Sequence, residues 1–299
     1  MQIEWSWYIA TYLFLGGLGA GAYITSAVAD IWGKEKYSTL SKFGAHASWL
    51  VIIVGLVLLI LDLGRPELGR LDHILNVLNN PTSMMTIGVY LLTAFLIVAV
   101  LTSLFWISKW SRSWLRTVVE TVGSVLAVAV ALYTGLLLAL ARGIPLWQSP
   151  FLPWLFTLSA ASTGLVLVGL SCSPLASTLF PRFSTSPKGE TLHIIGKADT
   201  ILIEAELVTV GLYLSSLIFT EAGARSVTRL LGGVMGFVFW GIVVVIGLLV
   251  PLFIETYGLT YLKRTSRINA IPTTLMITFI LILIGGLFLR YSILFAGQI

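Results

Sequence analysis

The chain has 299 residues, of which 57% are hydrophobic and only 10% are charged, and its mean hydropathy is +0.97. Soluble domains carry roughly 25% charged residues, so this composition excludes an ordinary soluble enzyme and indicates a membrane protein. The formal net charge of +5 comes mostly from the segments between apolar stretches, so we interpret it as membrane topology and expect no nucleic-acid partner.

Eight apolar stretches follow one another along the chain, and each can cross the hydrocarbon layer as a helix. Such a span needs about 20 apolar residues. Runs this long and unbroken favour helices over the strands of a β-barrel, whose pattern alternates. We therefore predict an all-α integral membrane protein built from two four-helix bundles, residues 1–142 and 143–299. The predicted spans are 7–31, 43–63, 84–108, 117–142, 151–172, 193–219, 229–255 and 271–293.

The orientation follows from the positive charges of the connecting segments. The connections after the first, third, fifth and seventh spans carry more Lys and Arg than the other connections and the two ends. Because positive loops stay in the cytoplasm, we expect both termini outside a cell inner (cytoplasmic) membrane. We expect no cleaved signal peptide, since the first residues carry Glu4 and no positive charge and the first stretch is long enough to span.

The outer end of the first span is rich in aromatic residues. An aromatic belt at the headgroup level explains Trp5, Trp7 and Tyr8 as well as ligand binding does. Tyr12 and Tyr133 are predicted to lie deeper, where a phenol can donate a hydrogen bond to a carbonyl in an apolar pocket. This chemistry suits a quinone headgroup. The candidate quinone residues of this end are Tyr8, Thr11, Tyr12 and Tyr133.

The run Gly16-Gly-Leu-Gly-Ala-Gly21 in the same span resembles a nucleotide-binding glycine motif. It has no preceding strand and no βαβ unit, so we reject that interpretation. Gly17 and Gly21 lie four residues apart on one helical face, a spacing that lets two membrane helices approach closely.

Charged residues cluster where the second span ends. Asp62 and Arg65 stand beside Pro66, which ends the helix, and an ion pair between them would hold an interfacial or re-entrant segment. Arg142 follows the fourth span at the same face. We expect these groups to serve quinone binding and proton exchange with water, and the set is Asp62, Arg65, Glu67 and Arg142.

The sixth predicted span, 193–219, contains five ionisable residues, which is unusual because buried charges in lipid are costly. His193, Lys197 and Glu204 share one helical face, and Asp199, Glu206 and Tyr213 form a second line at seven-residue spacing. Two interpretations stay open, ion pairs of Lys197 that fix packing or a proton path from the cytoplasm. The full predicted path is Asp30, His46, Glu120, His193, Lys197, Asp199, Glu204, Glu206 and Glu255, with Glu206 the strongest candidate.

Cysteine and histidine content limits the cofactors that this protein can hold. The lone Cys172 cannot bind an iron–sulfur cluster or complete a thiolate zinc site. His46 and His193 begin spans on the same side, so a haem with two histidine ligands is conceivable, but we favour polar roles within the bundle. We expect no haem, metal or cluster in this protein.

Several motifs, taken in order, resemble the NrfD / polysulfide reductase membrane-subunit family. They are Trp7 to Tyr23, Asp-Leu-Gly-Arg-Pro-Glu at 62–67, Asn80-Pro81-Thr-Ser83, Tyr133-Thr-Gly135 and Pro145-Leu-Trp147, and the resemblance covers residues 5 to about 215. Tyr133 matches the family's quinone-pocket tyrosine. Members with a known pocket also carry an Asn and a His three residues apart on the first helix, where this protein has Ile9 and Tyr12.

The resemblance implies a membrane subunit of a respiratory oxidoreductase complex that oxidises or reduces menaquinone or ubiquinone, with no cofactor of its own and with the terminal-substrate site in another subunit. It further implies a four-cluster iron–sulfur subunit and a molybdopterin catalytic subunit docked at the outer face. Proton transfer across the membrane is a separate hypothesis. Two other classes fit the span pattern, a stand-alone secondary transporter or ion pump and a passive membrane anchor.

Overall fold

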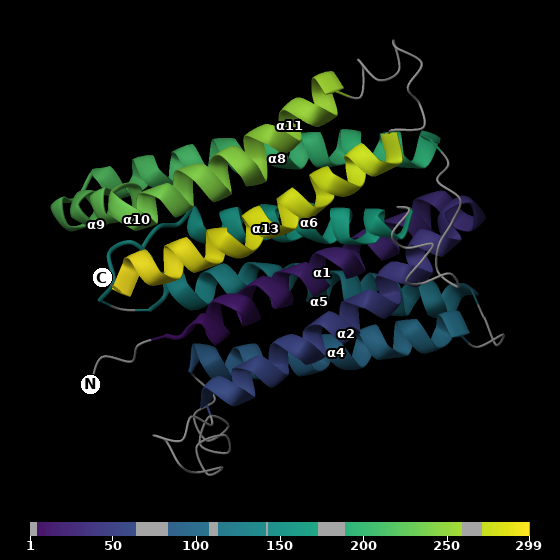
Figure 1. Cartoon of the computed structure of the whole chain (residues 1–299). Coiled ribbons are helices and arrows are strands. Elements are labelled where there is room, and N and C mark those ends of the chain that lie inside the picture. Colours follow the sequence, from purple (N-terminus) through teal and green to yellow (C-terminus); the bar gives the residue numbers. More distant parts are fainter. Residues whose placement is uncertain are drawn as a thin grey trace.

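The computed structural model describes residues 5–63, 83–107, 113–141, 143–172, 189–258 and 271–298. All regular structure in these ranges is helical, and eight segments are long and apolar enough to cross a membrane. The protein is therefore an all-α, multi-pass integral membrane protein, which confirms the predicted fold class (Figure 1).

The spanning segments run roughly alongside one another (Figure 1). They are α1 (Trp7–Gly33), α2 (Ser38–Leu63), α4 (Met84–Ile107), α5 (Ser113–Ala139), α6 (Leu152–Gly169), α8 (Gly189–Ile218), the composite seventh segment of α10 (Gly233–Gly236), η3 (Phe237–Leu249), α11 (Val250–Phe253) and η4 (Ile254–Gly258), and α13 (Ile271–Gln298). Single turns η1 (Lys34–Tyr37) and η2 (Leu170–Cys172) adjoin α1 and α6.

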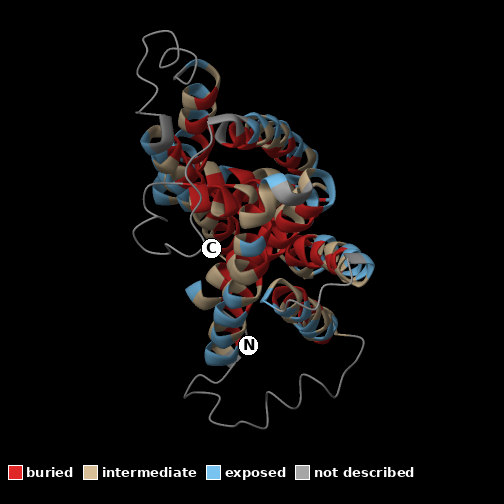
Figure 2. Ribbon diagram, turned by 90° about the vertical axis from the view of Figure 1, so that its right-hand side faces the viewer, coloured by how far each residue is buried: buried red, intermediate tan, exposed pale blue. Residues whose placement is uncertain are grey.

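Helix α1 is the central element of the fold. Its apolar window is 72% buried, against 28% for α4, because α2, α5, α6 and α13 all pack on it. One continuous core joins residues from α1 and α5 with residues from α6 and α13. Figure 2 shows the buried residues gathered along the inner sides of the helices. The predicted division into two separate four-helix bundles is not confirmed, and the domain boundary after residue 142 stays a prediction.

The small residues of α1 let α6 approach it at backbone distance. A Cβ built on Gly21 would collide with the backbone of Ala160, and one built on Gly164 would collide with the backbone at Gly21. Gly17 faces Ala160 on the same side. The packing role predicted for the glycine run is therefore confirmed.

The start of the seventh span differs from the prediction. Residues 221–231 form a separate helix, α9 (Glu221–Leu231), and the spanning segment begins only at Gly233. Thr220 caps α9 by accepting a hydrogen bond from the Gly223 amide, and Gly233 adopts a positive φ of 56° that redirects the chain. The exposed Arg225 and Arg229 suit an amphipathic helix at the membrane surface, which hydropathy alone merges with the span.

Much of the seventh span is π-helical, over Phe237–Leu249 and Ile254–Gly258. The amide of Val250 donates to the carbonyl of Val245, five residues back. Pro251 follows directly, and in an α-helix its ring would clash with the carbonyl four residues earlier. The wider turns accommodate this proline while Gly247 contacts Gly285 of α13.

The two ends of the described chain meet at one end of the helix bundle (Figure 1). The amide of Trp5 donates to Gln298 Oε1 at 2.6 Å, and Gln298 Nε2 donates to the carbonyl of Trp5 at 3.1 Å. An even number of spans requires both ends on the same side of the membrane. We name this end of the bundle the outer end, after the predicted orientation, and that orientation stays a prediction.

We expect Gly21→Ala to lower the thermal denaturation midpoint of the detergent-solubilised protein by several degrees, because the new methyl group would displace α6 from α1. Size-exclusion chromatography after heating measures the midpoint. Gly241→Ala is the matched control, since a Cβ there meets its nearest atom at 3.6 Å, an ordinary contact. Equal midpoints for the two variants would contradict the close α1–α6 packing.

Candidate functional site

Tyr12 of α1 and Tyr133 of α5 lie side by side inside the outer half of the bundle. They are 3% and 4% exposed, and their side chains interact with each other. Tyr12 is five residues past Trp7, which places it about 8 Å along the helix at 1.5 Å per residue. Two phenol groups from different helices therefore meet below the aromatic end of the bundle.

Glycines of the neighbouring helices shape the space around this tyrosine pair. A side chain at Gly88 of α4 would overlap the ring and hydroxyl of Tyr133, so Tyr133 projects directly onto the α4 backbone. Tyr12 Cδ2 lies 3.7 Å from a Cβ built on Gly55 of α2. The pair thus sits where α1, α2, α4 and α5 converge.

The residues above the pair bind mainly to one another. Tyr8 is half-buried and stacks on Trp7 with ring centroids 4.1 Å apart, which suits a place in the aromatic belt. The hydroxyl of Thr11 donates to the carbonyl of Trp7 at 3.0 Å. Asp62, in the last turn of α2, accepts a hydrogen bond from the Ser6 hydroxyl and so links α2 to the start of α1. Arg65, Glu67 and Arg142 lie outside the described residues.

Trp147 closes the outer end of the core, a role that the motif Pro145-Leu-Trp147 does not by itself reveal. Trp147 is 1% exposed, and its ring packs on that of Trp5 with centroids 5.3 Å apart. Its Nε1 donates a hydrogen bond to the carbonyl of Ile293 at 2.9 Å. The hydroxyl of Tyr213 donates to the carbonyl of Leu146 at 2.8 Å. This loop therefore ties α8 and α13 to the end of α1.

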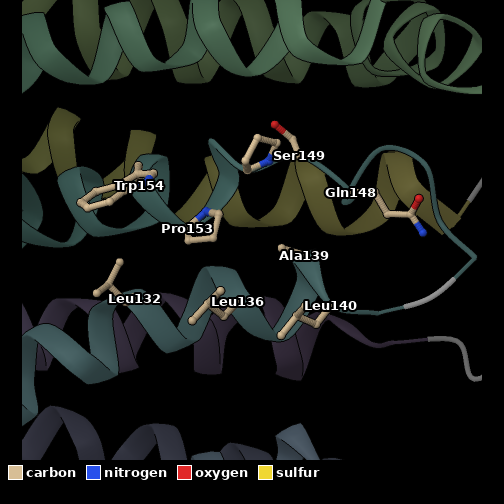
Figure 3. Close-up of a pocket in the computed structure, with 9 residues that line it drawn as sticks. Leu132, Leu136, Ala139, Leu140, Gln148, Ser149, Pro153 and Trp154 are labelled. Atoms are coloured by element: carbon tan, nitrogen blue, oxygen red, sulfur yellow. The ribbon is translucent and has the colours of Figure 1, made fainter. Parts of the chain in front are cut away.

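An open apolar cleft lies beside this end, between α5 and α6, with a volume of about 520 Å³. Figure 3 shows Leu132, Leu136 and Leu140 on one side and Trp154 on the other, with Gln148 at the end. Leu132 neighbours Tyr133 in sequence, but none of the predicted quinone residues lines this cleft.

The opposite half of α1 carries a charged cluster. Arg116 of α5 bridges Asp30 at 2.9 Å and approaches Glu120 at 3.9 Å. Its guanidinium also lies over the ring of Trp106, 4.3 Å from the centroid. Asp30 and Glu120 are both buried, and Arg116 interacts with both carboxylates. His46 of α2 donates from Nδ1 to the carbonyl of Lys42 at 2.6 Å.

A second acidic pair lies between α8 and the seventh segment. Asp199 of α8 and Glu255 of η4 interact with each other, and both are buried. Ser162 donates to Asp199 at 2.7 Å and Thr200 donates to Glu255 at 3.1 Å. Asp199 Oδ2 and Glu255 Oε1 have no hydrogen-bond partner within the described residues. Two carboxylates in contact in an apolar medium can hold one proton between them.

Glu206 lies within the electrostatic influence of a cation that the sequence prediction missed. Arg290 of α13 is fully buried and donates to Ser159 Oγ at 2.7 Å and to the carbonyls of Gly286 and Phe156 at 2.9 and 3.0 Å. The side chain of Ser159 also interacts with Glu206, on which the charge of Arg290 acts. Arg290 lies three residues before the end of the predicted span 271–293, whereas α13 continues eight residues beyond it to Gln298.

These groups form one buried polar line along the α6–α8 interface. Asp199, Glu206 and Tyr213 are buried, so the predicted seven-residue line is the inner side of α8. Ser162 contacts Asp199 and Ser159 contacts Glu206 and Arg290, each from α6. We refer to this set as the buried polar line, and it consists of Glu255, Asp199, Ser162, Ser159, Glu206, Arg290 and Tyr213.

The other predicted line of α8 faces outward. Lys197 and Glu204 are exposed, on the side of α8 away from Asp199 and Glu206. The packing alternative is an ion pair of Lys197 with Glu204 or Asp199, and neither pair is among the ion pairs of the described residues. The side chain of His193 lies outside the described residues.

Comparison with known proteins gives one family model and two relatives that match nearly the full length of the chain, and a further relative that matches part of it. The family model described as "Polysulphide reductase, NrfD" matches residues 1–299. The polysulfide reductase C subunit of Wolinella succinogenes is 33% identical, over 99% of this chain and 95% of that protein. Protein NrfD of Escherichia coli is 27% identical, over 100% and 96%. The Hdr-like menaquinol oxidoreductase integral membrane subunit of Archaeoglobus fulgidus is 25% identical, over 56% of this chain and 41% of that protein.

We expect Arg290→Met to lower the free energy of unfolding by about 3 kcal/mol or more, because Glu206 and Ser159 would lose their buried cation. Adding Glu206→Gln should recover part of that loss, since it removes the uncompensated carboxylate. Chemical denaturation in detergent measures both. Arg229→Met, at an exposed position of α9, serves as the control. A double variant as unstable as the summed single variants would contradict the coupling.

Proposed function

Because the chain belongs to the polysulphide reductase NrfD family, we propose that it is the quinone-reactive membrane subunit of a multi-subunit oxidoreductase. The observation that carries the proposal is the tyrosine pair, two buried phenol groups from α1 and α5 in apolar surroundings. Phenol groups can donate hydrogen bonds to the carbonyl oxygens of a quinone, and apolar side chains around them suit the quinone ring.

The site works by orienting a quinone or quinol that enters from the lipid between the outer halves of the helices. Tyr12 and Tyr133 position its oxygens. Oxidation of a quinol to the quinone releases two protons and two electrons. Asp62, half-buried at the outer end of α2, exchanges the protons with water, and we assign Arg65 and Glu67 to the same task. The electrons pass to an iron–sulfur cluster of a partner subunit; reduction of a quinone follows the reverse balance.

The partners are, in this proposal, an iron–sulfur subunit with four clusters and a molybdopterin subunit that holds the terminal-substrate site. Both dock at the outer face of a cell inner membrane, where the two termini also lie. The membrane subunit itself carries no haem and no cluster. Two relatives support this assignment over a stand-alone transporter, since their names describe parts of a polysulfide reductase and of a menaquinol oxidoreductase. The buried tyrosine pair supports it over a passive anchor.

Proton transfer through the buried polar line is the second part of the proposal. Its members follow α6 and α8 from Glu255 toward the outer end of the bundle. Along the way the guanidinium of Arg290 approaches Gly17 of α1. Gly17 lies only five residues beyond Tyr12. The line therefore leads toward the helix that carries the quinone site, and its carboxylates and hydroxyls can hold or pass protons.

We expect Tyr133→Phe to reduce quinone-linked turnover of the assembled complex about tenfold or more, because a hydrogen bond of about 1.5 kcal/mol is lost at the substrate oxygen. Gly88→Ala should have a similar effect, since the methyl group displaces Tyr133. Turnover is measured with a soluble quinol analogue, with dye-linked activity of the partner as the assembly check. Tyr291→Phe, in an aromatic row of α13, is the control. Unchanged turnover in Tyr133→Phe would reject this site.

For the proton path we expect Glu206→Gln to lower the number of protons moved per electron in proteoliposomes, while electron transfer continues. The amide keeps the hydrogen bond with Ser159 but cannot carry a proton. Glu221→Gln at the exposed start of α9 is the matched control. An unaltered ratio in Glu206→Gln would remove Glu206 from the path and leave the quinone assignment intact.

A further inference from the structure

The outward side of α8 has a regular pattern of exposed residues. They recur at alternating spacings of three and four, the period with which one helix packs along another. The same helix buries Asp199 and Glu206 on its opposite side, so the pattern separates two faces. We call the outward set the α8 seam, and it includes Lys197, Ile201, Glu204, Val208, Gly211 and Ser215.

Glu204 is the residue of the seam that lipid alone cannot accommodate. It lies ten residues from Ile194, about 15 Å along the helix, within a span that runs to Ile218. A glutamate side chain is too short to reach either membrane surface from there, whereas Lys197 lies close enough to the end of the span to extend to it. Within the described part of the chain Glu204 has neither a hydrogen bond nor an ion pair. Carboxylates at this depth face a cavity or a partner.

Small residues continue the seam toward the outer surface. Gly211 and Ser215 are four residues apart and exposed, a spacing that allows a second helix to approach closely. A Cβ built on Gly211 meets no atom of the described residues within 4 Å, so packing within that part of the chain does not explain this glycine. By contrast, the glycines of α1 are each in contact with a neighbouring helix. Glu204 and the small residues Gly211 and Ser215 thus lie along one face of α8, and the described part of the chain does not cover that face.

We propose that the α8 seam binds a membrane-spanning helix of a different subunit, and that this helix carries a Lys or Arg near its midpoint opposite Glu204. A second copy of this protein fits poorly. A two-fold axis normal to the membrane would place Glu204 of one protomer at the same depth as Glu204 of the other. A cation on a foreign helix satisfies the charge instead. The proposal extends beyond quinone chemistry and does not rest on it.

The test uses a photoreactive amino acid at Val208, which is 64% exposed on the seam, in the complex purified from membranes. The matched control position is Val125 of α5, which is 67% exposed. We expect Val208 to form one adduct with a second polypeptide of the complex. Mass spectrometry should locate the adduct in an apolar segment of about 20 residues with a central Lys or Arg. Val125 should give lipid adducts.

The charge is tested in the same assay. Glu204→Arg should abolish the Val208 adduct, and changing the partner's basic residue to Glu should restore it; Glu221→Arg on α9 should change nothing. Adducts with lipid only, with a second copy of the protein, with a segment of the same polypeptide, or with a helix lacking a basic residue would each overturn the proposal. So would an adduct that persists in Glu204→Arg. Quinone-linked turnover, measured in parallel, reports separately on the tyrosine site.

Discussion

A guanidinium buried inside a membrane must find all of its partners within the protein, and Arg290 imposes this constraint on the fold. Its guanidinium donates hydrogen bonds to Ser159 and to the Phe156 carbonyl of α6, and its positive charge interacts with Glu206 of α8. A Cβ on Gly17 of α1 would come within 3.3 Å of its Nη2, so α1 covers it closely only because that residue is a glycine. Four helices from both halves of the chain, α1, α6, α8 and α13, thus converge on one charge.

Polar groups are distributed unequally around this point. In the outer half of the bundle α1 and α5 present the phenols Tyr12 and Tyr133 among apolar side chains, whereas buried carboxylates lie in the other half, at Asp30, Glu120 and the Asp199–Glu255 pair. Neutral donors suit an uncharged ring that arrives from lipid. Paired acids suit the retention and release of protons. Under the function proposed above, this arrangement separates the orientation of a quinone from the movement of protons, and both depend on the same central helix.

The sequence predicts well those features that depend on local composition and spacing. Hydropathy finds the spans, the four-residue spacing predicts the packing of Gly17 and Gly21, and seven-residue spacing identifies the line of Asp199 and Glu206. It fails where partners lie far apart in the chain. Arg290 meets Ser159 across 131 residues, and nothing local in α13 indicates that contact. The boundary at Gly233 is missed for another reason, because an amphipathic surface helix directly precedes the span.

Arg290 also has a consequence for biosynthesis. Membrane proteins are inserted from the N-terminus, so α1 and α6 enter the membrane long before α13 is made. Until the last helix arrives, Glu206 and Ser159 have no cation, and the glycine face of α1 has no guanidinium to cover. A carboxyl group without a cation in the bilayer is held in its protonated form, so Glu206 enters the membrane neutral. Insertion of α13 then brings the guanidinium of Arg290 beside Ser159 and completes the contacts of the core.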